Sequence, residues 1–365
     1  MSDETFRIDE PLQVGLDPVE QWLHWEERAN LPGFRAPAEV VEIDVVSVPR
    51  DAVHVETSLG PDHPVLRRFL RGERVMLPRH PLNRDASVAY FDAPVAERWG
   101  ARYTSSRTLA FSSRSGEPLF SVKLPTDHPH RDFHQPEKAR MREETRDALR
   151  ALERLDRAGR ILGAELSLRV LREVLAVWVP DTESAFLVRD LSPFQRGSYY
   201  LPGLSIPWVG RQLARRHGVA FESFWEEHYA AASGRAKAVL FARGGLQQKT
   251  PNPQNLLVEL DTRLLPTGTI VLRDIGDADC VTDSIPCTEG IWSRLTGELK
   301  PETKNTFWAF DEAFDHSVET STLERWHRAH DHAYFGTLAR YFPSRAPERV
   351  VDAAASLQHW SDALR

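Results

Sequence analysis

Two polar residues at the ends of a predicted hairpin have the side chains that bind divalent cations. Asn255 opens a run of strand-forming residues at 255–261, and Asp274 lies near the end of a second run at 269–276. Because one turn joins the two runs, the amide oxygen and the carboxylate can lie at the same edge. A phosphate-bound Mg²⁺ prefers such oxygen ligands, and protein kinases use a comparable Asn and Asp pair. Asn and Asp are also common turn residues at strand ends, which leaves that alternative open.

A second polar group has the composition of an anion site. Ser105, Ser106 and Thr108 surround Arg107, and Lys123 follows on the next predicted strand. Arg provides a two-pronged donor and Lys a point charge, so together they could surround a triphosphate. The alternative is a solvated hairpin face that carries two basic residues.

The elements that position these residues are mainly strands in the first half of the chain and helices in the second. Strand patterns occur at 38–49, 74–78, 86–92, 107–111, 119–125 and 184–191, with a turn at 113–118, in addition to the hairpin. Helical spacing occurs at 19–28, 136–158, 208–243, 322–342 and 348–365, whereas 167–180 fits either state. Strands followed by helices, without regular βα alternation, indicate an α+β fold.

Composition narrows the class of protein. The 365 residues include 46 basic and 53 acidic side chains, for a net charge of −7, which argues against a nucleic-acid-binding protein. No apolar stretch approaches the length of a membrane span, and the polar N-terminus does not resemble a secretory signal. Two cysteines, Cys280 and Cys287, do not make a disulfide scaffold. We therefore expect a cytoplasmic protein without a membrane partner.

The order of the motifs between about Leu77 and Val281 resembles the IucA/IucC-type siderophore synthetases, which work independently of nonribosomal peptide synthetases. The matching positions are His80 with Pro81, the Ser106-Arg107-Thr108 segment, Lys123, Arg189, Gln254 with Asn255, and Arg273-Asp274 with Gly276. Enzymes of this family use ATP and Mg²⁺ to adenylate a carboxylate, often of citrate, and release AMP and pyrophosphate. They then transfer the acyl group to an amine or a hydroxyl.

The resemblance implies a role for each matched residue. Asn255 and Asp274 would bind Mg²⁺. The nucleotide would be held by Ser105, Ser106, Arg107, Thr108, Lys123, Arg189, Asn252, Gln254 and Arg273. Lys123, Arg107 and His80 are the candidate catalytic residues. His80, His128 and His130 adjoin the matched motifs and are therefore candidate bases for the second step.

The sequence departs from the family pattern at three places. Asn252 replaces a His of the family, Thr250 replaces a Glu, and Leu82-Asn83 replaces Trp-Gln. An Asn can still donate a hydrogen bond, but it cannot act as a cation or as an acid or base near neutral pH. The chain is also shorter than typical members, mainly at the N-terminal domain. The carboxylate is therefore left open as citrate-like or another acid.

Two alternative functions share parts of this site. A kinase-like phosphotransferase would also use Asn255 and Asp274 but would release ADP, and the sequence has no H-R-D-type base before Asn255. A non-catalytic relative that binds a nucleotide or metabolite would explain the replacements at Asn252 and Thr250.

We expect an α+β fold in two parts. Residues 1–135 would form a reduced N-terminal region and a strand-rich, fingers-like domain. Residues 136–365 would form a mainly helical, palm-like domain that contains a kinase-like metal-binding hairpin, with ATP between the two. The expected partners are a small-molecule carboxylate and an amine or hydroxyl substrate. The resemblance is compatible with a homodimer, which the sequence itself neither supports nor opposes.

Overall fold

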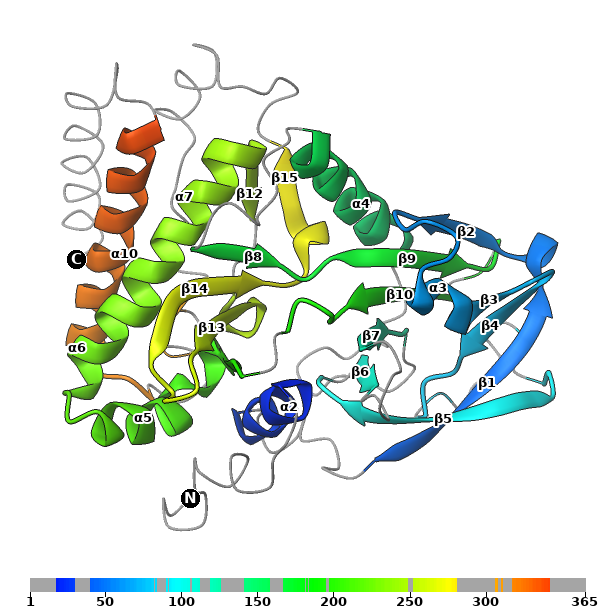
Figure 1. Ribbon diagram of the computed structural model, residues 1–365, viewed down its shortest axis with the longest axis horizontal. Coiled ribbons are helices and arrows are strands. Elements are labelled where there is room, and N and C mark those ends of the chain that lie inside the picture. Colours follow the sequence, from blue (N-terminus) through cyan, green and yellow to red (C-terminus); the bar gives the residue numbers. More distant parts are fainter. Residues whose placement is uncertain are drawn as a thin grey trace.

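The protein, here a computed structural model, has a large curled antiparallel sheet beside a mainly helical part built on a smaller sheet (Figure 1). It is a mixed α+β structure, as the sequence predicts. The structure describes residues 18–29, 40–81, 83, 90, 92–105, 107–111, 119–125, 141–157, 167–180, 182, 184–194, 197–248, 252–280, 306–307, 310 and 317–341.

The large sheet has nine strands, and every neighbouring pair is antiparallel. In spatial order they are β2 (His54–Thr57), β9 (Glu173–Trp178), β10 (Ala185–Asp190), β7 (Phe120–Lys123), β6 (Thr108–Phe111), β5 (Val95–Tyr103), β1 (Val41–Pro49), β4 (Arg74–Pro78) and β3 (Leu70–Arg71). The sheet curls around a core rich in aromatic side chains, in which Phe69 contacts Trp99, Phe120 and Phe186.

The smaller sheet carries the predicted hairpin. Its order is β11 (Tyr199–Pro202), β13 (Leu256–Leu260), β14 (Pro266–Leu272) and β8 (Leu168–Val170), with β8 parallel to β14. A separate pair joins β12 (Leu246–Gln248) to β15 (Ala278–Cys280). The hairpin is therefore part of a sheet whose buried face lies against helices.

Most of the described helices surround this smaller sheet or link it to the large one, whereas α3 packs against β3 and β4 of the large sheet. They are α2 (Pro18–Ala29), α3 (Pro64–Phe69), α4 (Met141–Arg157), α5 (Arg211–Arg216), α6 (Phe221–Trp225), α7 (Ala232–Gly244) and α10 (Thr320–Tyr341). Shorter turns are η1 (Arg50–Ala52), η2 (Gly203–Ser205), η5 (Pro253–Asn255) and η6 (Ile275–Asp277), and η3 (Ile206–Gly210) and η4 (Glu226–Ala231) are π-helical.

Helix α4 spans the top of the molecule between the two sheets (Figure 1). Ala148, Ala151, Leu152 and Leu155 recur at helical spacing and are buried, which explains why this strongly charged segment is helical. The prediction of a helix at 136–158 is confirmed for 141–157, and residues 136–140 and 158 lie outside the described residues.

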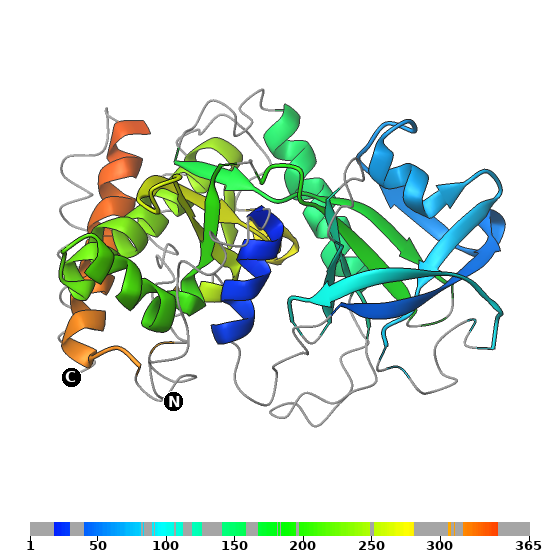
Figure 2. The same ribbon diagram turned by 60° about the horizontal axis from the view of Figure 1, so that its bottom comes forward.

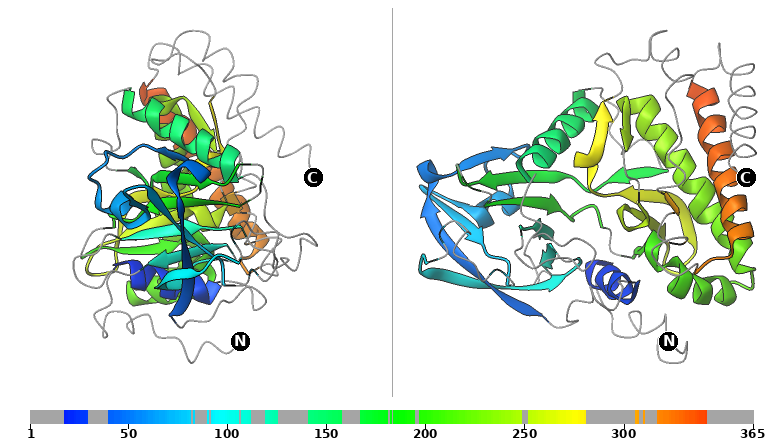
Figure 3. Two further views of the ribbon diagram at one scale, coloured as in Figure 1. Left: turned by 90° about the vertical axis from the view of Figure 1, so that its right-hand side faces the viewer. Right: turned by 180° about the vertical axis from the view of Figure 1, so that it is seen from behind.

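Helices α7 and α10 lie in close contact. A Cβ added at Gly234 would come within 2.2 Å of the His330 carbonyl oxygen, so only glycine allows this approach. A cluster of buried apolar side chains joins α2 to both sheets. From outside the helix it includes Ala110, Leu191, Tyr200 and Val271. Figure 2 and the right panel of Figure 3 show α2 between the strand-rich part and the helical part.

Several predicted elements differ in the structure. The ambiguous segment 167–180 contains two strands, β8 and β9. All six residues of β9 are buried, so they show no alternation that could distinguish a strand from a buried helix. In the strand predicted at 86–92, Tyr90 instead lies in a turn with φ of +60°. The predicted turn at 113–118 and the helix at 348–365 lie outside the described residues, as do His128 and His130.

The predicted division at residue 135 stays a prediction. The large sheet includes β9 and β10, which follow that position, so its strands do not all come from the first part of the chain.

Within the described residues, no helix is both long and apolar enough to span a membrane.

Candidate functional site

The hairpin places Asn255 and Asp274 at one edge of the smaller sheet. The Arg273 N–H donates to the Asn255 carbonyl oxygen at 3.1 Å, which extends the register that pairs Leu256 with Leu272. Asp274 follows with φ of +63°, in the left-handed region that Asp tolerates better than most residues. The chain turns there into η6. The two ends of the hairpin therefore meet as the sequence pattern predicts.

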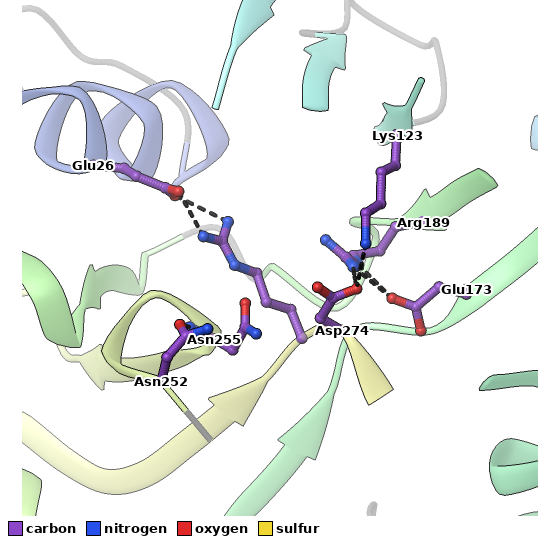
Figure 4. A network of polar contacts seen from close by, with 8 residues as sticks. Glu26, Lys123, Glu173, Arg189, Asn252, Asn255 and Asp274 are labelled. Atoms are coloured by element: carbon purple, nitrogen blue, oxygen red, sulfur yellow. Dashed lines mark hydrogen bonds and ion pairs between the residues drawn. The ribbon is translucent and has the colours of Figure 1, made fainter. Parts of the chain in front are cut away.

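Two cations from the large sheet contact the Asp274 carboxylate (Figure 4). Lys123 Nζ lies 3.4 Å from Oδ1, and an Arg189 guanidinium nitrogen lies 3.1 Å from the same atom. Lys123 pairs with Leu187 across β7 and β10, so Lys123 and Arg189 share one face of the sheet. The exposed fraction is 11% for the Lys123 side chain and 32% for that of Asp274. Asp274 thus bridges the hairpin and the large sheet while remaining accessible.

The electrostatics of this cluster keep Asp274 ionised. Burial raises the pKa of Asp274, but the positive charges of Lys123, Arg189 and Arg273 outweigh it and hold the pKa well below its usual range. The carboxylate is therefore negatively charged near neutral pH.

Arg189 is also held by a second acidic residue. Its guanidinium donates to Glu173 Oε1 at 2.7 Å, and the two side chains are 7% and 1% exposed. Burial raises the pKa of Glu173, while Arg189 opposes that rise. The other oxygen, Oε2, is buried and has no hydrogen-bond partner within the described residues. Arg189 is therefore fixed between two carboxylates, those of Glu173 and Asp274.

Arg273 is occupied in the same way by helix α2. Its guanidinium donates to both oxygens of Glu26, at 3.0 and 2.5 Å, and lies 5.3 Å from the ring centre of Trp22. Arg273 and Glu26 are 4% and 0% exposed. The nucleotide or carboxylate contact predicted for Arg189 and Arg273 stays a prediction, and in this structure both guanidinium groups are satisfied by carboxylates.

The Asn252-to-Asn255 segment is shaped by its own side chains. Asn252 caps η5, since its side-chain oxygen accepts from the backbone N–H groups of Gln254 and Asn255 at 3.0 and 3.2 Å. The Asn255 side chain is largely buried and lies near Asp274 in Figure 4. Within the described residues, the hydrogen bonds of Asn255 are made by its backbone N–H and carbonyl groups, not by its side-chain amide.

The described residues of the predicted phosphate-binding segment lie beside Lys123, on strand β6 and at the turn before it. Thr108 pairs directly with Lys123 across β6 and β7, and the Leu124 N–H donates to the Arg107 carbonyl oxygen at 2.8 Å. The Ser105 N–H donates to the Thr108 carbonyl oxygen at 3.4 Å in a tight turn. Ser106 lies outside the described residues. The structure thus brings Thr108 to Lys123 and places Ser105 and Arg107 at the adjoining turn.

His80 lies in a different environment. It is 1% exposed, its ring lies 5.7 Å from that of Tyr103, and it lines a small cavity of about 30 Å³ with Asn83 and Pro125. Burial raises the pKa of Tyr103 to about 12. A catalytic role for His80 stays a prediction.

The residues present fit a divalent cation that arrives with phosphate oxygens. Both cations contact Oδ1 of Asp274, and Oδ2 makes no hydrogen bond within the described residues. Asp274 and Asn255 supply two oxygen ligands, which suits Mg²⁺ because it is bound by one or two carboxylates and substrate phosphates. The described residues hold no group of three or more His, Cys, Asp and Glu side chains that could bind a metal without a substrate.

Sequence reasoning missed two residues of the site, Glu26 and Glu173. Glu173 directly precedes a run of apolar residues at 174–179, and Glu26 follows two tryptophans on the buried face of α2. An acidic residue at a buried position needs a partner, so each position carried a signal. The partner of Glu26 is 247 residues away, which the sequence pattern does not reveal.

Comparison with known proteins identifies the fold. No protein-family model and no curated protein sequence matches the chain. Among solved structures, the ATP-bound aerobactin synthetase IucA of a hypervirulent Klebsiella pneumoniae pathotype matches with a TM-score of 0.56 and 16% identity, over 86% of this chain and 64% of that one.

Two further structures give the same result. The aerobactin synthetase IucC of the same pathotype has a TM-score of 0.56 and 14% identity, over 97% of this chain and 74% of that one. The petrobactin biosynthesis protein AsbB of Bacillus anthracis str. Sterne has a TM-score of 0.57 and 10% identity, over 88% and 63%. The chain thus shares the fold of siderophore synthetases and spans about two thirds of their length.

Proposed function

We propose that this protein is an ATP-dependent ligase of the siderophore-synthetase type. It would adenylate a carboxylate, citrate-like or another, and transfer the acyl group to an amine or hydroxyl. The observation that carries the proposal is the Asp274 carboxylate, which lies beside Asn255 and is contacted by Lys123 and Arg189. It occurs on a fold shared with an ATP-bound aerobactin synthetase.

Different residues of the chain would bind the phosphates and the cation of the nucleotide. Lys123 and Thr108 face the hairpin from neighbouring strands and would contact the phosphates, with Ser105 and Arg107 at the turn beside them. Asp274 and Asn255 would hold Mg²⁺, which neutralises phosphate charge when bound. Arg189 would act mainly by fixing Asp274, because Glu173 already occupies its guanidinium.

The proposed reaction has two steps. A carboxylate oxygen of the substrate attacks the α-phosphorus of ATP, and the bond to pyrophosphate breaks. An amine or hydroxyl then attacks the acyl carbon, loses its proton, and displaces AMP. The first step places negative charge on the phosphates, and a largely buried Lys123 stabilises that charge more strongly than a solvated lysine would.

Binding would rearrange the ion pairs of the site. Lys123 contacts Asp274 in this structure, and a phosphate group would compete for the same ammonium. Asp274 would then be freed for the cation, while Arg189 keeps Glu173 as a partner. A cytoplasmic location, where ATP is available, and a homodimer remain part of the proposal.

A product assay tests the proposal. The protein is incubated with Mg-ATP, hydroxylamine and a panel of di- and tricarboxylates, and AMP, ADP, pyrophosphate and hydroxamate are resolved. We expect AMP, pyrophosphate and a hydroxamate that depend on one carboxylate. ADP would instead identify a phosphotransferase, and ATP binding without turnover would identify a non-catalytic relative.

Matched variants connect the activity to the site. Lys123→Ala and Asp274→Asn should each lower carboxylate-dependent AMP formation by about 10²-fold or more, the usual cost of losing a group that stabilises transition-state charge. Arg98→Ala removes one positive charge from an exposed ion pair with Asp44 and should leave the rate unchanged. Equal rates in all three variants would exclude this site.

A further inference from the structure

One fully buried carboxylate of helix α2 contacts the start of the first hairpin strand and the end of the second. Glu26 is 0% exposed and accepts from the Arg273 guanidinium through both of its oxygens. Its Oε1 atom also accepts from the Gln254 side-chain amide at 3.3 Å. Figure 4 shows Glu26 reaching from the helix towards the hairpin. One side chain of α2 therefore contacts the two strand ends at once.

These contacts fall on the residues that immediately precede the candidate cation ligands. Gln254 precedes Asn255, and Arg273 precedes Asp274. The backbone bond from Arg273 to Asn255 joins the same two ends. A shift of either Gln254 or Arg273 would therefore move a candidate ligand with it.

Helix α2 is fixed well enough to serve as a reference point. The Tyr200 N–H donates to Gln21 Oε1 at 2.9 Å, and the Ser205 hydroxyl donates to the Trp25 carbonyl oxygen at 2.9 Å. The Trp22 and Trp25 side chains are fully buried. These contacts attach α2 to β11 and η2, so Glu26 projects from a helix that is hydrogen-bonded to the smaller sheet and the turn beside it.

Glu26 also holds the Arg273 guanidinium in an ion pair. The positive charge of Arg273 acts on Asp274 as well as on Glu26. Without Glu26, Arg273 would be a buried cation lacking its close carboxylate, and Asp274 would be the nearby replacement. A third cation drawn to Asp274 would compete with a divalent metal for that carboxylate.

We propose that Glu26 is a positioning residue for a divalent-cation site formed by Asn255 and Asp274. It holds Gln254 and Arg273 so that the two ligand oxygens face the same space, and it keeps Arg273 away from Asp274. The inference rests on the proposed function only in assigning Asn255 and Asp274 to a cation. It does not depend on which carboxylate or nucleophile is used.

The hairpin offers a matched control for a purely structural effect. Glu259 on β13 is also buried, at 4% side-chain exposure, and pairs with Arg169 at 2.7 Å. It lies towards the turn of the hairpin, away from Asn255 and Asp274. Glu26→Gln and Glu259→Gln thus each remove one buried negative charge, from contacts at opposite ends of the hairpin, and Glu26→Asp keeps the charge on a shorter side chain.

The test measures Mn²⁺ binding through the electron paramagnetic resonance signal of the free ion, on the full chain. Titrations are made with protein alone and with α,β-methylene-ATP. Partners of metal ligands typically contribute about 10- to 100-fold in metal affinity. We expect Glu26→Gln to weaken Mn²⁺ binding by about that factor, Glu26→Asp to recover part of it, and Glu259→Gln to change it less than about twofold.

The outcomes separate this inference from the proposed function. Equal Mn²⁺ affinities in Glu26→Gln and Glu259→Gln, or no Mn²⁺ binding by the unaltered protein in either titration, would overturn the inference. Mn²⁺ binding that is lost only in Glu26→Gln, in a protein that makes no AMP with any carboxylate, would support it while removing the proposed adenylation. If Glu26→Gln and Glu259→Gln lower the thermal stability equally, the difference between their Mn²⁺ affinities still decides the question, because a purely structural effect would be the same in both.

Discussion

The buried pair of Glu173 and Arg189 leads to an asymmetric prediction for stability. Arg189→Gln leaves Glu173 buried and without its close cation, because its hydrogen bond and ion pair within the described residues are both with Arg189. Glu173→Gln leaves Arg189 with a second carboxylate, Asp274, at 3.1 Å. Removal of the arginine should therefore destabilise the protein more than removal of the glutamate.

The size of the effect follows from the burial of the pair. Breaking a buried ion pair by removing one partner costs about 3–5 kcal/mol. The unfolding entropy is about 2.1 cal/mol/K per residue, which for 365 residues gives about 0.8 kcal/mol/K. Arg189→Gln should then lower Tm by about 4–6 °C, and Glu173→Gln by about half of that or less.

The penalty in Arg189→Gln should also depend on pH. Burial raises the pKa of Glu173, and loss of Arg189 removes the charge that opposes this rise. A carboxyl whose pKa is higher in the folded than in the unfolded state destabilises the folded state as pH rises above the unfolded value of about 4.3. The penalty stops growing once pH exceeds the folded pKa. The Tm difference from the unaltered protein should thus be smaller at pH 5 than at pH 8.

Calorimetry of the three proteins at pH 5, 6.5 and 8 measures both effects. A loss in Glu173→Gln that equals or exceeds that in Arg189→Gln would show that Asp274 does not support the arginine. A penalty in Arg189→Gln that is constant over this range would show that Glu173 is not held as a buried, charged group. Either result would refute the electrostatic account of the cluster.

Two further predictions concern single side chains. Asn252→Ala removes the cap of η5 and should cost about 1 kcal/mol, whereas Asn252→Asp keeps an acceptor and most of that stability; urea midpoints compare the two, and equal losses would contradict the capping role. Burial raises the pKa of Asp331 to about 7, with Lys237 opposing, so ionised Asp331 destabilises the folded state as pH rises. Asp331→Asn should therefore raise Tm relative to the unaltered protein more at pH 8 than at pH 5, and a gain that does not depend on pH would contradict this.

The sequence predicted the parts of the site that depend on local pattern. The hairpin predicted from the 255–261 and 269–276 runs is present as β13 and β14, although β14 begins at Pro266 and ends at Leu272, before the predicted end at 276. The predicted meeting of Asn255 with the Asp274 end is also present. The 74–78 strand is found with the same bounds as β4. Like β9, β13 and β4 are buried almost throughout and do not alternate, but they are short apolar runs bounded by turn residues, which favours a strand.

The parts that failed depend on tertiary contacts. Strand β9 is buried throughout, so its apolar run carried no periodicity, and its place in the large sheet could not be predicted. The arginine partners of the buried Glu26 and Glu173 carboxylates become known only when α2 and β9 are placed in the fold. The nucleotide contacts that the motif resemblance implies for Arg189 and Arg273 stay a prediction, while the carboxylates that contact these two arginines in the structure were not predicted.

Carboxylate-dependent exchange of labelled pyrophosphate into ATP tests the central claim most directly, because it isolates adenylation from the transfer step. The account predicts exchange that requires Mg²⁺ and one particular carboxylate, occurs without any amine or hydroxyl acceptor, and is lost in Asp274→Asn and Lys123→Ala. Turnover of ATP to ADP with no pyrophosphate exchange, for a protein that folds and binds ATP, would contradict it.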